Sequence, residues 1–233
     1  MPNSIRSASD ECEGKRRGTT NASLASLRTI ALVVIPGAGG VARLVELAGG
    51  PTALPPKPHV TESPLPLILH IIAALTFAVL GAFQFLPGLR SRRPGWHRFS
   101  GRLVVVLGFV VALTALWLNE VTPRPTAAAQ LLYLFRLAAG SGMAIGMVLG
   151  VTTIRRGDIA GHRAWMIRAY ALAFGAATHV FTIGIGQAIF GDTEHTNALM
   201  QGAGWLINLA IAERAIRRPE RRPAPARAQV AIS

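Results

Sequence analysis

One uncharged segment, Ala169 to Phe190, constrains this chain more than any other feature. It is 22 residues long, with only His179 able to acquire a proton. As an α-helix it would measure about 33 Å, enough to cross the roughly 30 Å hydrocarbon core of a bilayer. Only 15% of all residues are charged, whereas soluble domains usually hold about 25%. The sequence therefore predicts an integral membrane protein.

Further apolar runs along the chain predict an all-α fold with six transmembrane helices. The six-helix domain is predicted at residues 28–213, between a disordered tail at 1–27 and a basic, Pro-rich tail at 214–233. The first run contains Pro36 and is short, so it must extend on both sides to span. The predicted spans are Thr29–Ala42, Leu65–Leu86, Leu103–Leu118, Ala127–Ile154, Ala169–Phe190 and Thr196–Ala212.

The connections between these runs alternate between Arg-rich and Arg-poor, and this pattern predicts the orientation. Basic connections remain on the cytoplasmic side of a membrane. We therefore expect a multi-pass protein of the cytoplasmic membrane, with both termini inside and the Asp192–His195 loop outside. The net charge of +13 follows from these clusters and the two tails, so the expected partner is the lipid bilayer and not nucleic acid.

Three polar residues lie inside the predicted spans. An ionisable side chain in lipid is costly and needs a polar partner, so it marks a candidate functional site. His70, Arg136 and His179 lie on three different spans, about 8, 6 and 5 Å outward of the respective midpoints. If these three side chains face one another at this common depth, each supplies the polar partner that the others require.

A second polar layer lies at the cytoplasmic edge, where His97–Arg98 and His162–Arg163 each precede an apolar run. Neutral imidazole is a common ligand of haem iron, and guanidinium groups match the carboxylates of haem propionates. The two layers together predict b-type haem binding and transmembrane electron transfer, with quinone or another redox partner. The predicted iron ligands and propionate partners are His70, His97, His162, His179, Arg98, Arg136 and Arg163.

Two other functions stay open at this point. The same histidines and arginines could handle protons or an anion in a transporter, or the chain could be a non-catalytic structural subunit. On one continuous helix His162 and His179 would lie about 100° apart, which disfavours two haems stacked against it. The sequence has no Ser-His-Asp arrangement, phosphate-binding loop or carboxylate pair, so a hydrolase is not predicted.

Glycines recur every four residues in the fourth span, at Gly142, Gly146 and Gly150. Residues four apart lie on one face of a helix, and small residues there let a second backbone approach closely. We expect this face to pack against a neighbouring helix.

Several ordered motifs resemble a bacterial membrane-protein family, domain of unknown function 2306. These are a histidine within a helix, then G-x-F-Q-F-L-P, an Arg-rich turn, H-R-x-x-G-R and later H-R-x-W-M-I-R, over about residues 65–212. The chain has His179 where the pattern leads us to expect an arginine. The resemblance implies no activity, but it draws attention to His70, Gln84, Phe85, Arg90, His97, Arg98, Gly101, Arg102, His162, Arg163, Trp165, Met166 and Arg168.

Overall fold

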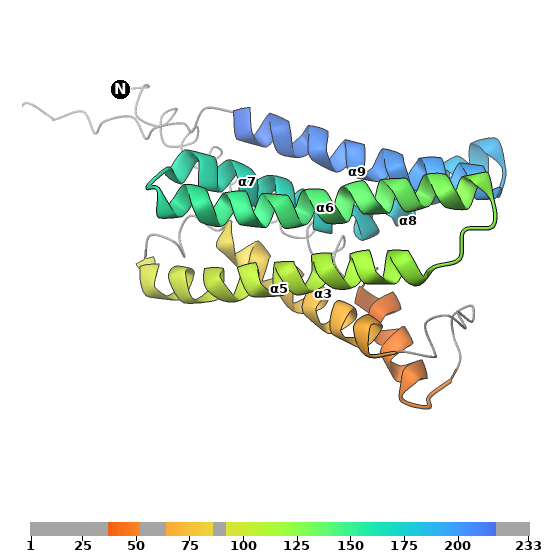
Figure 1. Cartoon of the computed structure of the whole chain (residues 1–233), viewed down its shortest axis with the longest axis horizontal. Helices are drawn as coiled ribbons and strands as arrows, with labels where there is room; N and C mark the ends of the chain where they lie inside the picture. Colours follow the sequence, from red (N-terminus) through yellow and green to blue (C-terminus); the bar gives the residue numbers. More distant parts are fainter. Residues whose placement is uncertain (1–36, 52–63, 86–91, 218–233) are drawn as a thin grey trace, which may run out of the picture.

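A computed structural model describes residues 37–51, 64–85 and 92–217 of the chain (Figure 1). Every regular element in these ranges is helical, so the predicted all-α class is confirmed for them. After a first helix at 37–47, the helices are α3 (Leu65–Gln84), α5 (Pro94–Val121), α6 (Ala127–Arg155), α7 (Ile159–Ala173), α8 (Gly175–Phe190) and α9 (Glu194–Arg217).

Within residues 37–51, 64–85 and 92–217, the candidate spans number three or four, against the six predicted for the chain. By length and composition α3, α5 and α6 can each cross a membrane, and α7 with α8 forms a fourth candidate as a bent pair. The sixth predicted span lies in α9, which has 24 residues but is not among the helices apolar enough to qualify. Most of the first predicted span, residues 29–36, lies outside the described ranges.

The fifth predicted span is not one continuous helix. α7 ends at Ala173, α8 begins at Gly175, and the two are bent by 49° relative to each other. Glycine is one of the usual causes of a sharp kink, and Gly175 lies at the bend. The angle calculated between His162 and His179 on a straight helix therefore does not apply.

Local sequence signals account for several helix ends. α6 begins after Thr126, whose hydroxyl accepts a hydrogen bond from the Ala129 amide at 3.1 Å. Asp158 caps α7 in the same way through the Gly161 amide at 2.8 Å. Such caps satisfy amides that the first helical turn leaves without partners. Gly191, with φ +83°, ends α8 in a conformation that favours glycine.

The long helices α5 and α6 lie side by side and antiparallel, and α9 lies along the other side of α6 (Figure 1). α3 packs on α5, α7 on α6, and α8 on α9. The buried core lies between α3, α5, α6 and α7. Phe77, Val104, Met147 and Ala169, one from each of these helices, are at most 2% exposed.

The glycine stripe of α6 packs against α7, as predicted. A Cβ at position 146 would lie 3.1 Å from the Cβ of Ala169, which is tighter than ordinary contact. Gly142 and Gly150 likewise approach Leu172 and Met166 of α7. The absence of side chains on this face therefore lets the two helices pack closely.

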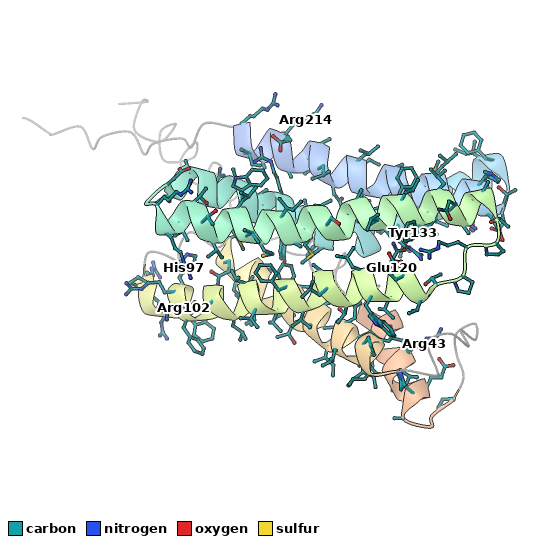
Figure 2. The ribbon with its side chains drawn as sticks, viewed as in Figure 1. Arg43, His97, Arg102, Glu120, Tyr133 and Arg214 are labelled. Atoms are coloured by element: carbon teal, nitrogen blue, oxygen red, sulfur yellow. The ribbon has the colours of Figure 1, made fainter. Side chains whose placement is uncertain are left out.

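Two helices extend past the predicted boundaries at the Arg-rich end of the molecule. α5 begins at Pro94 instead of Leu103, so His97 and Arg98 lie within its first turns. α9 continues through Arg214 to Arg217, four residues into the predicted tail. Figure 2 shows His97, Arg102 and Arg214 at this end, with Glu120 and Tyr133 toward the other end.

Many large apolar side chains point outward from the bundle. Leu113, Ile145, Ile185 and Leu206, on four different helices, are each at least 55% exposed. Soluble proteins rarely expose apolar surface on this scale, whereas a lipid bilayer accommodates it. The helices therefore suit a membrane environment.

Candidate functional site

Arg136 is a half-buried guanidinium in the outward-predicted half of α6. Its Nη2 donates a hydrogen bond to Gln201 Oε1 on α9 at 3.3 Å. In the described part of the chain, no aspartate or glutamate forms an ion pair with it. Since a buried charge needs compensation, Arg136 leaves a positive centre open to a negative ligand.

His179 on α8 and Arg136 on α6 both adjoin Gln201 of α9, since Arg136 bonds to the Gln201 side chain and the Gln201 backbone lies near the imidazole. The His179 Nε2 atom is buried and has no hydrogen-bond partner within residues 37–51, 64–85 and 92–217. The imidazole packs edge-on against the Trp205 ring, with centroids 4.5 Å apart and planes at 89°. The sequence predicted that Arg136 and His179 share a depth, and in the structure both lie next to α9.

Two glycines allow α9 to approach the helices that carry these side chains. A Cβ at Gly204 would lie 2.7 Å from His179 Cδ2, and one at Gly202 would lie 2.7 Å from the Phe135 ring. α9 can therefore pack against α6 and α8 at the same level, which brings Gln201 between Arg136 and His179.

Polar side chains continue from this site toward the α8–α9 connection. Gln201 Nε2 donates to the Asn197 carbonyl at 3.4 Å. Asn197 Oδ1 accepts from Gln187 Nε2 at 2.9 Å, and both amides donate to Asp192 Oδ1 at 3.0 Å. A continuous set of polar groups therefore connects Arg136 with the loop that the sequence predicts to be outside.

Polar contacts also continue toward the Arg-rich end. Thr178 Oγ1 donates to Asn208 Oδ1 at 2.8 Å, and Asn208 Nδ2 donates to the Ala171 carbonyl at 3.2 Å. Beyond them, Arg168 binds Glu213 through Nε at 2.5 Å and Nη2 at 3.1 Å.

We call these groups of polar contacts, which follow one another along α9, the polar seam. It runs between α9 on one side and α6, α7 and α8 on the other, because Asn197, Gln201, Trp205 and Asn208 are spaced four, four and three apart on one face of α9. Its members are Asp192, Gln187, Asn197, Gln201, Arg136, His179, Trp205, Thr178, Asn208, Arg168 and Glu213.

His70 does not join the polar seam. Its Nδ1 lies 3.0 Å from the Thr114 hydroxyl on α5, which itself donates to the Val110 carbonyl at 2.5 Å. His70 therefore belongs to the α3–α5 interface, whereas His179 belongs to the α8–α9 interface. Of the three residues predicted to form an outer cluster, His70 lies apart, and only Arg136 and His179 lie next to α9.

The residues of the inner layer lie at the Arg-rich end. His162 on α7 donates from Nδ1 to the Gly150 carbonyl of α6 at 2.8 Å. His97 and Arg98 lie near the start of α5, with Arg98 exposed, and Arg163 follows His162 on α7. Gln84, from the same motif, donates to Ser100 Oγ at 2.7 Å. Among the described residues, no group of three or more His, Cys, Asp or Glu side chains forms a metal site.

The sequence reasoning did not place Asn197, Gln201, Trp205 or Asn208 in a site. Their helical spacing on an otherwise apolar segment was the signal that could have identified them. Glu213 was missed because it follows the predicted end of the sixth span.

The fold and the site define a helical membrane protein with polar groups inside its bundle. The chain matches the family described as "Predicted membrane protein (DUF2306)" over residues 67–216, more than half of its length. It therefore belongs to this family, as the ordered motifs indicated. Searches of the curated proteins and of the solved structures find no match to this chain.

Proposed function

We propose that this protein binds a small monovalent anion at Arg136 inside the membrane and passes it along the polar seam, as a transporter does. The observation that carries the proposal is the half-buried Arg136 guanidinium, which forms no ion pair with an acid of the described residues. Its partner Gln201 also adjoins the His179 ring, whose Nε2 has no hydrogen-bond partner among the described residues. A bound anion would supply the missing negative charge.

The charge at the site favours a monovalent ligand. Arg136 provides one formal positive charge, and the other seam groups at this level, Gln201 and Trp205, are neutral. One negative charge makes the site neutral, whereas a divalent anion would leave excess charge in a low-dielectric environment. The Gln201 amide and the His179 ring can contribute hydrogen bonds once the anion is bound.

The location of the site within the polar seam supports transport over simple binding. Polar groups extend from Arg136 to Asp192 in one direction and to Glu213 in the other. The bend between α7 and α8 lies on this route. Interrupted helices are typical of substrate sites in secondary transporters, because their ends offer polar backbone groups inside the membrane.

Chloride flux from proteoliposomes, with nitrate and formate as competitors, would test the proposal. Arg136→Gln removes the charge but keeps a polar side chain, and we expect more than about 100-fold weaker binding, since breaking a buried charge pair costs about 3–5 kcal/mol. Arg156→Gln, on the exposed C-cap of α6, is the matched control. Equal chloride binding and flux in wild type and Arg136→Gln would overturn the proposal.

We also propose that the chain crosses the cytoplasmic membrane six times, with both termini in the cytoplasm. The 24 residues of α9 correspond to about 36 Å of helix, which is sufficient to span. Its polar face lies against α6, α7 and α8 through the seam contacts, so low overall hydropathy is compatible with a membrane position. The clustering of arginines at one end of the bundle supports this orientation.

A second candidate function is b-type haem binding by His97 and His162 at the Arg-rich end, with electron transfer to quinone or another partner. The bond from His162 Nδ1 to the Gly150 carbonyl favours it, because that bond leaves Nε2 as the nitrogen available to iron. Arg98 and Arg163 are the candidate propionate partners. Bound haem would supply one-electron redox chemistry. His70 and His179 lie at separate interfaces and are not proposed as a pair.

A reduced-minus-oxidised absorption spectrum of protein purified from haem-replete cells tests this candidate. Haem bound here would give a b-type α band that disappears in His162→Ala but persists in His179→Ala. Folded protein without Soret absorption would exclude the candidate and leave the anion proposal unaffected.

A further inference from the structure

The bend between α7 and α8 occurs where side chains of α9 contact both helices. The Trp205 indole lies against Gly175, where an added Cβ would clash with Nε1. Only a residue without a side chain fits at this point. Trp205 can therefore occupy this position only because α8 begins with a glycine.

Carbonyl groups in the last turn of any helix lack partners within that helix. At the end of α7, the Leu172 carbonyl accepts a hydrogen bond from Trp205 Nε1 at 3.2 Å. The Ala171 carbonyl accepts one from Asn208 Nδ2, also at 3.2 Å. Two side chains of α9 thus satisfy backbone groups that would be costly to leave unpaired in a membrane.

Asn208 contacts both sides of the bend. Its amide nitrogen bonds to Ala171 of α7, and its amide oxygen accepts from the Thr178 hydroxyl in the first turn of α8. Thr178 immediately precedes His179, whose ring packs against Trp205. The groups that hold the bend therefore also contact the segment that carries His179.

We propose that Trp205 and Asn208 are positioning residues of the anion site, and that they set the angle of α8 so that His179 faces Arg136. This inference rests on the proposed function. Neither residue needs to contact the anion: Asn208 acts through Thr178, and Trp205 acts through the His179 ring and the Leu172 carbonyl. Loss of either contact would let α8 rotate or straighten and would separate His179 from Arg136.

The test uses the full-length protein in detergent and measures chloride affinity and the thermal midpoint Tm for each variant. Thr178→Val keeps the side-chain shape but removes the donor to Asn208, and Asn208→Leu removes both hydrogen bonds. We expect each to weaken chloride binding roughly tenfold, the size expected for an ordinary lost hydrogen bond. Thr178→Ser retains the hydroxyl and should bind as wild type does.

Because Thr178 and Asn208 act through one contact, the double variant should lose much less affinity than the product of the two single effects. A merely structural role would lower Tm without producing this coupling in chloride affinity. Trp205 provides a second readout through its fluorescence. Chloride should change the emission of wild type and of Trp117→Phe, and the change should disappear in Trp205→Phe.

The outcomes separate this inference from the proposed function. If Arg136→Gln abolishes chloride binding while Thr178→Val and Asn208→Leu bind as wild type does, the positioning role is refuted and the anion site stands. Independent effects of the two substitutions on affinity would also refute it. If Arg136→Gln leaves chloride binding intact, the anion site itself is wrong, and the positioning role is refuted with it.

Discussion

Arg168 and Glu213 form a two-bond ion pair that ties α7 to α9, with Nε to Oε1 at 2.5 Å and Nη2 to Oε2 at 3.1 Å. The pair lies beyond Asn208 at the Arg-rich end of the polar seam. Arg168 also lies over the Trp165 ring, 4.8 Å from its centroid. A guanidinium held on one side by carboxylate and on the other by an aromatic face has little freedom to move.

This ion pair predicts a loss of stability in acid. The hydrogen bond from Arg168 lowers the pKa of the Glu213 carboxyl below its ordinary value of 4.5. The stabilisation is fully present above the unfolded value of 4.5 and is lost as the pH falls through the lower, folded-state pKa. Tm should therefore fall in this acidic range for wild type and change less for Glu213→Gln. Parallel decreases in both proteins would contradict the assignment.

Packing of α6 on α7 predicts a strong effect of Gly146→Leu. The new side chain would be forced into Ala169, and overpacking of this kind costs about 1–3 kcal/mol. The Tm of the detergent-purified protein should fall clearly. Gly184→Leu is the control, since nothing lies within 4 Å of a Cβ at that exposed position of α8. Equal Tm values in the two variants would mean that the glycine face does not hold the helices together.

The proposed orientation predicts which side of the membrane the α8–α9 loop faces. A cysteine at Thr193, introduced after replacing Cys12 by serine, should react with a membrane-impermeant maleimide added to intact cells. A cysteine at Arg156 should react only after the membrane is opened. Labelling of Thr193→Cys from the cytoplasmic side alone would reverse the orientation.

The outer part of the polar seam predicts a graded effect on anion access. Gln201→Leu removes the amide that bonds to Arg136 and to the Asn197 carbonyl. We expect chloride binding to weaken about tenfold, less than in Arg136→Gln, because a hydrogen bond is lost while the Arg136 charge remains. Leu199→Ala, on the exposed apolar side of α9, is the matched control. A larger loss in Leu199→Ala than in Gln201→Leu would place the access route elsewhere.

The sequence predicted the features that depend on composition and spacing within one helix. Uncharged runs located the apolar helices, and the four-residue spacing of Gly142, Gly146 and Gly150 identified a packed face. Depth along the helices drew attention to Arg136 and His179, and in the structure both adjoin Gln201. In each of these cases, the relevant information lies within a single segment.

The features that the sequence did not predict depend on contacts between distant segments. Depth does not fix rotation about a helix axis, so it could not show that His70 faces Thr114 and not His179. The segment 169–190 has no proline and contains three glycines, so its composition alone did not single out Gly175 as the site of a bend. Trp205 and Asn208, about 30 residues farther along, satisfy the backbone at that bend.

If α9 spans the membrane as proposed, its polar face has a consequence for how the protein is made. A helix with asparagine and glutamine on one face leaves the translocon for lipid less readily than an apolar helix does. α9 is the last of the described helices, so α6, α7 and α8 are synthesised before it. Their polar and glycine-lined surfaces can receive it directly, without a stage in which its amides face hydrocarbon. Membrane insertion of α9 should therefore depend on its neighbours, and a C-terminal fusion should report assembly of the whole bundle.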